Sequence, residues 1–389
     1  MLKSYRVGRV FGIPIEFDIT FLFILPIFAW LIGNQIEQLV PLLNDTLNAK
    51  IAVETLTSGA RPWLIGLIVA VGLFIGVVLH ELGHSLVALY YGYEIESITL
   101  WLLGGMANFT ETPRNWRHEF AIAIAGPIVS VAIGIICYYA LFDVPSGLDV
   151  IEFILAYLAV LNIAIAGFNL LPAFPLDGGR VLRALLARSQ PYVRATRQAA
   201  TIGKVFAVII GLSGLYMSNL FWVAIAFFIY IAAAAESQQM MLDAAFEGIS
   251  VRDIMTPATE LSNVPPDLPV DRLLDRMFRE RHTGFPVVDE NRRLLGIVTL
   301  SDVHNIESDD RLSTVVADVM TPVDEITIVS PNSEVTEALR EFRHNPVGRL
   351  LVVDEGGNLS GIITRTDVMT ALEIAQAEQR IEDRLPTSG

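Results

Sequence analysis

The sequence predicts a multi-pass α-helical membrane domain of about six spans with short membrane-associated β-strands, followed by an α/β tandem pair. Three observations support this fold class. Of the 389 residues, 53% are hydrophobic and only 18% are charged, whereas an ordinary soluble domain is about 25% charged. Long uncharged runs all lie before residue 240. From Ile249 onward the composition becomes that of a soluble domain, and a repeat of 65 residues appears.

Apolar runs locate the spans, because a spanning helix needs about 20 such residues. The runs cover residues 19–36, 62–79 with an extension to Tyr93, 120–142, 153–176 and 205–235. The last run has 31 residues with Asn219 near its middle, so it is either one long helix or two helices joined by a tight turn. The first run lacks a small-residue cleavage site, which indicates a retained span rather than a signal peptide.

Basic residues set the orientation through the positive-inside rule. They precede the first run, lie between the second and third runs, and follow the fourth, at Lys3, Arg6, Arg9, Arg114, Arg117, Arg180, Arg183, Arg188, Arg194, Arg197 and Lys204. The stretch 143–152, between the third and fourth runs, has none. This distribution places the N-terminus in the cytoplasm. If the last run forms two helices, the C-terminal tail returns to the cytoplasm as well. We therefore expect a multi-pass protein of the cell membrane with six spans.

Two segments, 8–20 and 93–109, alternate apolar and polar residues and are rich in β-branched types. This pattern predicts strands rather than helices. Irregular or extended backbone at a membrane is tolerated only where protein buries it or it lines a wet cavity. We expect two short strands packed beside the membrane core, the second ending at Gly104 and Gly105.

Charge and cysteine content exclude several classes of protein. Residues 1–240 carry 13 basic and 15 acidic side chains, whereas residues 241–389 carry 14 and 27, so nearly all of the net charge of −15 lies in the second part. An acidic C-terminal part disfavours nucleic-acid binding. The single cysteine, Cys137, cannot form an intrachain disulfide, and its apolar setting predicts an inert packed thiol.

His80, Glu81 and His84 form an HExxH motif in the second apolar run. On a helix, residues i and i+4 lie about 40° apart around the axis, so both imidazoles point to one place. Neutral imidazole nitrogens suit Zn²⁺, and Glu81 is close enough to act as general base on a metal-bound water. The alternative is a polar cluster satisfied by other helices, such as a proton or ion path.

Asp177 supplies the third ligand that a catalytic zinc site needs. It follows the fourth run in the segment NLLPAFPLDGGR, where Pro172 and Pro175 break the helix. Gly178 and Gly179 permit tight turns and close approach of the backbone. The alternative for Asp177 is a helix cap before a basic amphipathic segment.

The HELGH motif in one span, LDG after another and a GG-containing loop between them resemble the site-2 protease family of intramembrane zinc metalloproteases. The resemblance covers roughly residues 6–240. It implies that His80, His84 and Asp177 bind one zinc ion per chain and that Glu81 activates water. It also implies regulated intramembrane proteolysis, the cleavage of a single-span membrane protein within the lipid bilayer.

Members of that family carry an Asn eight residues before the metal-binding Asp, which matches Asn169. Its amide can donate to the developing oxyanion, and the alternative is an interhelical hydrogen bond. Asn162, two turns earlier, is more typical of a structural residue. Asp18 stands where relatives often have a His, and we assign it no role. The strand that ends at Gly104 and Gly105 offers an edge for an extended substrate.

The C-terminal part is a duplicated module. Met255, Val288, Gly296 and Asp302 recur 65 residues later as Met320, Val353, Gly361 and Asp367. Each copy predicts the order strand, helix (270–280 and 333–344), two strands, helix.

The duplication resembles tandem CBS domains, which commonly pack as a pair and bind adenine nucleotides. The matching Gly-x-x-Thr-x-x-Asp pattern implies nucleotide contacts from Thr299, Asp302, Thr364 and Asp367, with each Asp on ribose hydroxyls. The resemblance also suggests a homodimer formed through these domains. The alternative for each Thr and Asp is a helix cap.

These observations define the expected domains and the competing functions. We expect a protease domain over 1–240, a linker over 241–248, CBS domains over 249–310 and 311–376, and an acidic tail over 377–389. The leading hypothesis is a zinc endopeptidase. The first alternative is a CBS-regulated transporter or channel for divalent cations, which needs ionisable residues along a whole transmembrane path. The second is an inactive nucleotide-sensing scaffold, which the complete set of zinc positions disfavours.

Overall fold

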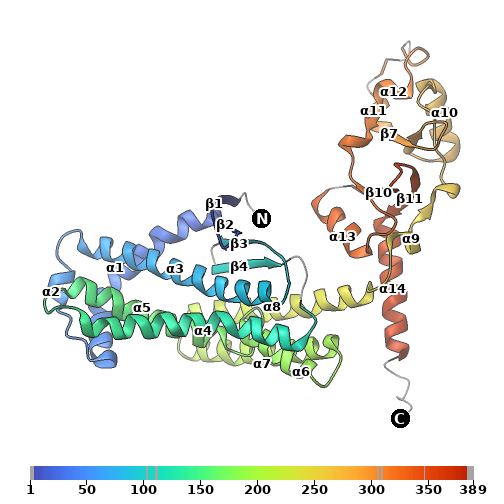
Figure 1. The fold of residues 1–389 in the computed structure, drawn as a ribbon. Coiled ribbons are helices and arrows are strands. Elements are labelled where there is room, and N and C mark those ends of the chain that lie inside the picture. Colours follow the sequence, from blue (N-terminus) through green and yellow to red (C-terminus); the bar gives the residue numbers. More distant parts are fainter. Residues whose placement is uncertain are drawn as a thin grey trace. The chain divides into compact units, whose positions relative to one another are not determined.

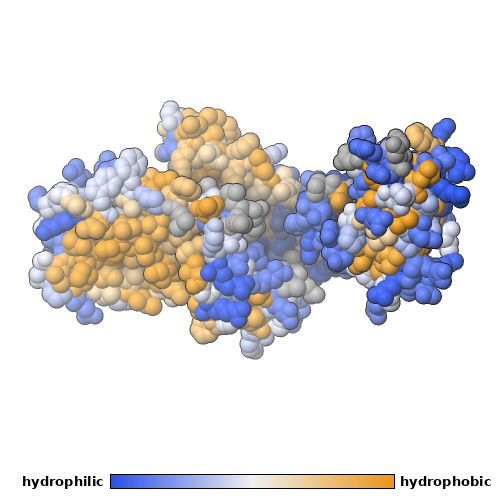
Figure 2. Space-filling view, turned by 90° about the horizontal axis from the view of Figure 1, so that it is seen from above, coloured by the Kyte–Doolittle hydropathy of each residue, from blue (hydrophilic) through white to orange (hydrophobic). Residues whose placement is uncertain are grey.

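The computed structural model of the chain forms two compact units, Met1–Gln238 and Gln239–Gly389 (Figure 1). It describes residues 4–101, 104–109, 113–304, 306–307, 310–345 and 347–382. In the space-filling view, hydrophobic side chains cover much of the first unit, whereas hydrophilic ones predominate on the second (Figure 2). The division into an apolar and a polar unit agrees with the predicted fold class.

Among the residues that the structure describes, six helices are long and apolar enough to cross a membrane, as predicted. They are α1 (Ile19–Leu47), α3 (Arg61–Tyr90), α4 (Trp116–Ala140), α5 (Asp149–Asn169), α7 (Tyr192–Tyr216) and α8 (Leu220–Ala245). A four-residue helix, α2 (Val53–Leu56), follows α1. The helix α8 continues to Ala245, so most of the segment expected to be a linker is helical.

The 31-residue apolar run is two helices, α7 and α8. Ser218, between them, has a φ of 53°, and the side chain of Asn219 accepts a hydrogen bond from the backbone N–H of Phe221 at 3.1 Å. The Asn219 side chain therefore caps the start of α8. This turn gives the sixth span.

Small residues let the spans approach closely. A side-chain carbon at Gly66 of α3 would overlap the carbonyl oxygen of Ala29 in α1. At Gly83 of α3, such a carbon would lie 2.8 Å from the Val129 side chain of α4. Close backbone contact at small residues is how helices pack in a membrane, where apolar surfaces alone do not drive helices together.

The two segments predicted as strands are hairpins that join in one sheet. Its strands are β1 (Ser4–Val10), β2 (Ile13–Asp18), β3 (Ile95–Trp101) and β4 (Gly104–Phe109), in the order β1-β2-β3-β4. The first hairpin turns at Phe11 and Gly12, with φ of 52° and 85°, and positive φ at both positions is what a tight two-residue hairpin turn requires. Ile13 and Ile98 pack against Leu82 of α3, so the sheet lies against the helix that carries HExxH.

The fourth span ends earlier than its apolar run. The helix α5 stops at Asn169, and a new helix, α6 (Asp177–Ala187), begins after a turn segment. A side-chain carbon at Gly179 would lie 2.7 Å from the carbonyl carbon of Ala173, and at Gly178 it would overlap the carbonyl oxygens of Leu170 and Leu171. The Gly-Gly pair is therefore needed for the turn that delivers Asp177.

The second unit contains the two predicted copies. The first has α9 (Val251–Ile254), β5 (Thr256–Pro257), α10 (Val270–Glu280), β6 (Gly284–Val288), β7 (Leu294–Thr299) and α11 (Leu300–Val303). The second has α12 (Val316–Val319), β8 (Thr321–Pro322), β9 (Ile328–Val329), α13 (Val335–His344), β10 (Arg349–Val353), β11 (Leu359–Thr364) and α14 (Arg365–Glu382). The predicted helices 270–280 and 333–344 correspond to α10 and α13.

Each copy contributes its Met-Thr-Pro strand to the sheet of the other copy. Strand β5 of the first copy pairs antiparallel with β11, and β8 of the second pairs with β7. A side-chain carbon at Gly361 would lie 2.5 Å from the carbonyl oxygen of Thr256, and at Gly296 it would overlap the carbonyl oxygen of Thr321. The repeated glycines are thus explained by this strand exchange.

Candidate metal centre

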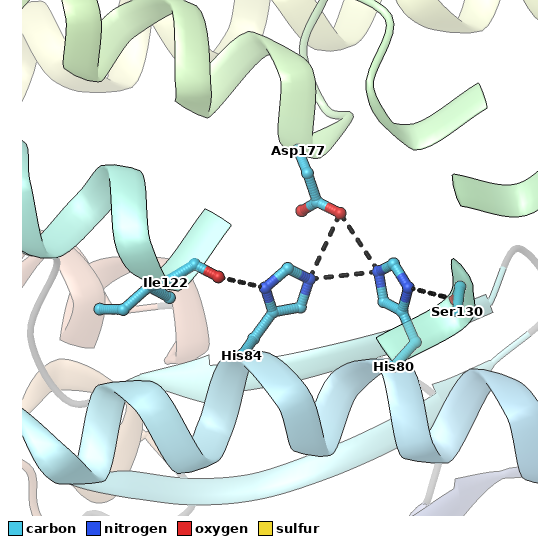
Figure 3. Close-up of polar contacts among 5 residues, drawn as sticks. All are labelled: His80, His84, Ile122, Ser130 and Asp177. Atoms are coloured by element: carbon cyan, nitrogen blue, oxygen red, sulfur yellow. Dashed lines mark hydrogen bonds and ion pairs between the residues drawn. The ribbon is translucent and has the colours of Figure 1, made fainter. Parts of the chain in front are cut away.

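Three side chains from two helices converge in the first unit (Figure 3). His80 and His84 project from α3, and Asp177 is the first residue of α6. The Nε2 atoms of the two histidines are 3.2 Å apart, and the Oδ2 atom of Asp177 lies 3.1 Å from Nε2 of His80 and 3.3 Å from Nε2 of His84. Among the described residues, these three form the one group of His, Cys, Asp or Glu side chains close enough to hold a metal ion.

The neighbouring helix α4 orients both imidazoles. Nδ1 of His84 donates a hydrogen bond to the carbonyl oxygen of Ile122 at 2.6 Å. Nδ1 of His80 lies 2.9 Å from the hydroxyl of Ser130. Because a carbonyl can only accept, His84 carries its proton on Nδ1, which leaves the Nε2 lone pair directed at the centre of the site. Such partners of metal-binding histidines fix the ring orientation and strengthen the ligand.

Gly126 of α4 makes room for the two rings. A side-chain carbon at this position would overlap Nε2 of His84 and lie 2.6 Å from Nε2 of His80. The backbone of α4 therefore comes close to the Nε2 atoms at Gly126, where it carries no side chain. Four residues to either side, Ile122 and Ser130 contact the Nδ1 atoms of the same two rings.

The donor set fits zinc. A tetrahedral ion with bonds of about 2.0–2.1 Å to nitrogen and oxygen has ligand atoms about 3.3 Å apart, and the three observed separations are 3.1, 3.2 and 3.3 Å. Three protein donors leave a fourth position open, as in catalytic sites.

Glu81 occupies the neighbouring position on α3 and faces the sheet. A side-chain carbon at Gly105 of β4 would lie 2.5 Å from Cγ of Glu81 and 3.2 Å from its Oε1. Strand β4 is an edge of the four-stranded sheet, because it pairs with β3 alone among the described strands. The carboxylate of Glu81 and an open strand edge therefore meet beside the three donors.

The two asparagines of α5 differ in their surroundings. Asn162 is buried, and its Nδ2 donates to the carbonyl oxygen of Leu158 at 2.9 Å. Its Oδ1 faces Gly76 of α3, where a side-chain carbon would lie 2.8 Å away, so Asn162 is part of the α3–α5 packing. Asn169 is half-buried at the end of α5 and takes part in none of the hydrogen bonds described for the three donors.

In the second unit, the repeated Thr and Asp residues form helix caps. The Oδ2 atom of Asp302 accepts hydrogen bonds from the backbone N–H and hydroxyl of Thr299, at 2.7 and 2.8 Å. Asp367 does the same for Thr364, at 2.8 Å for both bonds. These contacts match the capping alternative, and they use one of the two carboxylate oxygens of each Asp.

Sequence reasoning did not identify Ile122, Ser130 and Gly126. Each lies at the candidate metal centre because α4 packs against α3. Every apolar span has backbone carbonyls, and a serine or glycine within it is common, so no sequence pattern marks these three residues as part of a site. The sequence indicates Arg183 of α6 only as a cytoplasmic charge, whereas in the structure it forms a buried ion pair with Glu119. A charged residue with an amphipathic surrounding sequence carries no local sign that it is buried.

Comparisons with known proteins cover nearly the whole chain. The model of peptidase family M50 matches residues 68–148 and 145–212, and the CBS domain model matches residues 251–308 and 316–374. Zinc metalloprotease MJ0392 of Methanocaldococcus jannaschii is 36% identical over 386 residues, which cover 98% of this chain and 100% of that protein. Rip3 of Mycobacterium tuberculosis strain H37Rv is 31% identical over 392 residues, which cover 97% of this chain and 95% of Rip3.

A solved structure of the site-2 protease from Methanocaldococcus jannaschii is also similar to the chain. It is 36% identical in sequence, the match covers 60% of this chain and 95% of that one, and the TM-score is 0.40.

Proposed function

The chain belongs to peptidase family M50, the site-2 protease family, and from this premise we propose that His80, His84 and Asp177 bind the catalytic zinc ion and that Glu81 is the general base. The protein is an intramembrane zinc metalloprotease with a C-terminal CBS pair. The observation that carries the assignment of residues is the convergence of Nε2, Nε2 and Oδ2 at separations of 3.1–3.3 Å.

The residues divide the work of peptide hydrolysis. His80, His84 and Asp177 would hold a zinc ion, which when bound would supply an acidified water molecule and polarisation of the substrate carbonyl. The Glu81 carboxylate accepts a proton from the attacking water and passes it to the leaving amine. Asn169 offers its side-chain amide to the developing oxyanion, since it precedes Asp177 by eight residues at the end of α5.

We propose that the substrate is a single-span membrane protein held in extended form along β4. A helix hides its carbonyls in hydrogen bonds, so the scissile segment has to unwind before attack. The free edge of β4 supplies backbone hydrogen-bond partners for such a segment. Gly105 brings that edge against Glu81, so a substrate paired with β4 lies next to the general base.

For the CBS pair we propose binding of an adenine nucleotide. The caps at Thr299 and Thr364 use Oδ2 of Asp302 and Asp367, and Oδ1 of each is the atom assigned to ribose. Calorimetric titration of residues 239–389, the second compact unit, with ATP, ADP and AMP tests this. Absence of heat from all three with the folded unit would reject nucleotide binding, and unchanged binding by Asp302→Ala with Asp367→Ala would reject the ribose contacts.

We propose that the N-terminus and the CBS pair lie in the cytoplasm. The metal centre is then in the inner half of the membrane. His84 lies six residues before the end of α3 and contacts Ile122, six residues after the start of α4. At 1.5 Å per residue, both helices place the site about 9 Å from their cytoplasmic ends at its nearest point.

Metal analysis of the purified protein tests the zinc site. Wild type is expected to hold about one zinc ion per chain, because the described residues contain one suitable group of donors. His80→Ala and Asp177→Asn each remove one ligand and should lower the zinc content strongly, whereas Asp18→Asn, outside the group, should not. Wild-type zinc content in both ligand variants would eliminate the proposed site.

A further inference from the structure

A second charged cluster lies in the first unit, apart from the three metal donors. Nε and Nη2 of Arg183 on α6 both contact Oε1 of Glu119 on α4, at 2.7 and 2.6 Å. Nη1 of Arg183 contacts Oε1 of Glu236 on α8 at 2.6 Å. One guanidinium therefore joins three helices.

The two arms of this cluster differ in exposure. The side chains of Arg183 and Glu119 are 3% and 5% exposed, whereas that of Glu236 is 37% exposed. Buried charges beside a membrane are expensive and are typical of functional positions. Removing the guanidinium would leave the Glu119 carboxylate buried without its cation, which is strongly unfavourable.

Arg183 acts on both sides of Asp177. It belongs to α6, the helix that Asp177 begins. Its guanidinium carbon also lies 5.0 Å from the centre of the Phe174 ring, in the turn just before Asp177. A cation above the face of an aromatic ring is attracted to the ring. Arg183 therefore links the turn before Asp177 to the helix that Asp177 begins, and so holds the chain on both sides of the carboxylate.

The helix α4 connects this cluster to the histidines. Ile122 and Ser130 of α4 orient the two imidazoles, and Glu119, one turn before Ile122, pairs with Arg183. The same rigid helix therefore sets the position of the histidines and, through Arg183, that of Asp177.

We propose that Arg183 is a positioning residue that holds Asp177 against His80 and His84, with Glu119 as its fixed partner and Glu236 as its adjustable partner. Glu236 lies on α8, which ends at Ala245, where the chain continues into the CBS pair. A shift of α8 first alters the contact between Arg183 and the exposed Glu236. The position of Asp177 relative to the two histidines then changes with it. The inference rests on the proposed zinc site.

The test uses the full chain in detergent micelles. Arg183→Gln, Glu236→Gln and the double variant are compared with Arg180→Gln, an exposed arginine on the same helix. Three quantities are measured: the zinc dissociation constant by competition with a chelator, the absorption spectrum of the cobalt-substituted protein, and the Tm. The spectrum reports ligand geometry, which a residue needed only for folding does not change.

Arg183→Gln should weaken zinc binding about 10–100-fold, as loss of an outer partner of a metal ligand does, and should alter the cobalt spectrum. Glu236→Gln should have a smaller effect in the same direction. The double variant should match Arg183→Gln, because the two residues act as one unit. Arg180→Gln should match wild type.

A folded Arg183→Gln variant with the wild-type zinc constant and cobalt spectrum would overturn the proposal. If Arg183→Gln does not fold, the test rests on Glu236→Gln. A wild-type zinc dissociation constant and cobalt spectrum for Glu236→Gln would then overturn the proposal. Failure of wild type to bind zinc would instead refute the metal site, so the two failures are distinguishable.

Discussion

At the scale of single residues, the proposed zinc site depends on a glycine as well as on its three donors. The Nε2 atoms of His80 and His84 lie close to α4 at Gly126, where a side-chain carbon would overlap Nε2 of His84. Since the donor separations already fit a tetrahedral zinc ion, small displacements of either ring would spoil the site. The ability of the two histidines to bind a metal ion therefore depends on α4, a helix that itself provides no donor atom.

Gly126→Ala should abolish tight zinc binding. The added methyl group occupies the position of the imidazole nitrogens, so at least one ring has to turn away, and loss of ligand orientation costs about 10–100-fold in metal affinity. Zinc affinity measured by chelator competition checks this. Gly167→Ala in α5 is the control, because a side-chain carbon there meets nothing within 4 Å. Equal zinc affinity in the two variants would contradict the steric role of Gly126.

The three candidate donors could be predicted from the sequence, whereas the residues that support them could not. The i, i+4 spacing of His80 and His84 places them on one helix face, and the prolines before Asp177 indicate a helix break at membrane depth. Ser130 and Ile122 are different, because their contribution depends on which face of α4 meets α3. That face is selected by packing between residues 38 and 50 positions apart along the chain, and local periodicity holds no information on such contacts.

At the scale of elements, the CBS copies are joined through exchanged strands. The pattern Gly-x-x-Thr-x-x-Asp suggested a ligand site, yet each of its residues has a structural role. Gly361 admits the carbonyl of Thr256, and the Thr and Asp form a cap. The repeat was visible in the sequence, but the pairing of β5 with β11 was not, since identical motifs fit either sheet.

Gly361→Ala should destabilise the second unit. Its methyl group would lie 2.5 Å from the carbonyl oxygen of Thr256, so β5 has to move away, and overpacking of this kind typically costs about 1–3 kcal/mol. The Tm of residues 239–389 is the measurement. Gly348→Ala is the matched control, because a side-chain carbon there meets nothing within 4 Å. An unchanged Tm for Gly361→Ala would argue against the exchanged strand.

At the scale of the whole molecule, the described residues contain six helices long and apolar enough to cross a membrane, and an even number of spans is what the proposed orientation requires. The number of spans depended on the run 205–235, where composition allows one helix or two and the cap at Asn219 decides. The single candidate metal-binding group among the described residues also matters at this scale. A cation transporter needs ionisable residues along a path across the membrane, whereas three converging donor atoms with an open fourth position suit hydrolysis.

Reporter fusions test this arrangement. A reporter placed after residue 245 should be cytoplasmic, and one placed within residues 143–150 should be on the opposite side, because the positive charges flank the other ends of these spans. A C-terminal reporter on the outer side would refute the proposed orientation.

The most direct test of the account is the cleavage rate of the Glu81→Gln variant in vesicles that contain a single-span substrate. This variant should keep the zinc content of wild type, because all three proposed ligands remain, and should cleave about 10²–10⁴-fold more slowly, because the general base is lost. The rate is compared with wild type at equal zinc content. Cleavage by zinc-loaded Glu81→Gln at close to the wild-type rate would contradict the central claim.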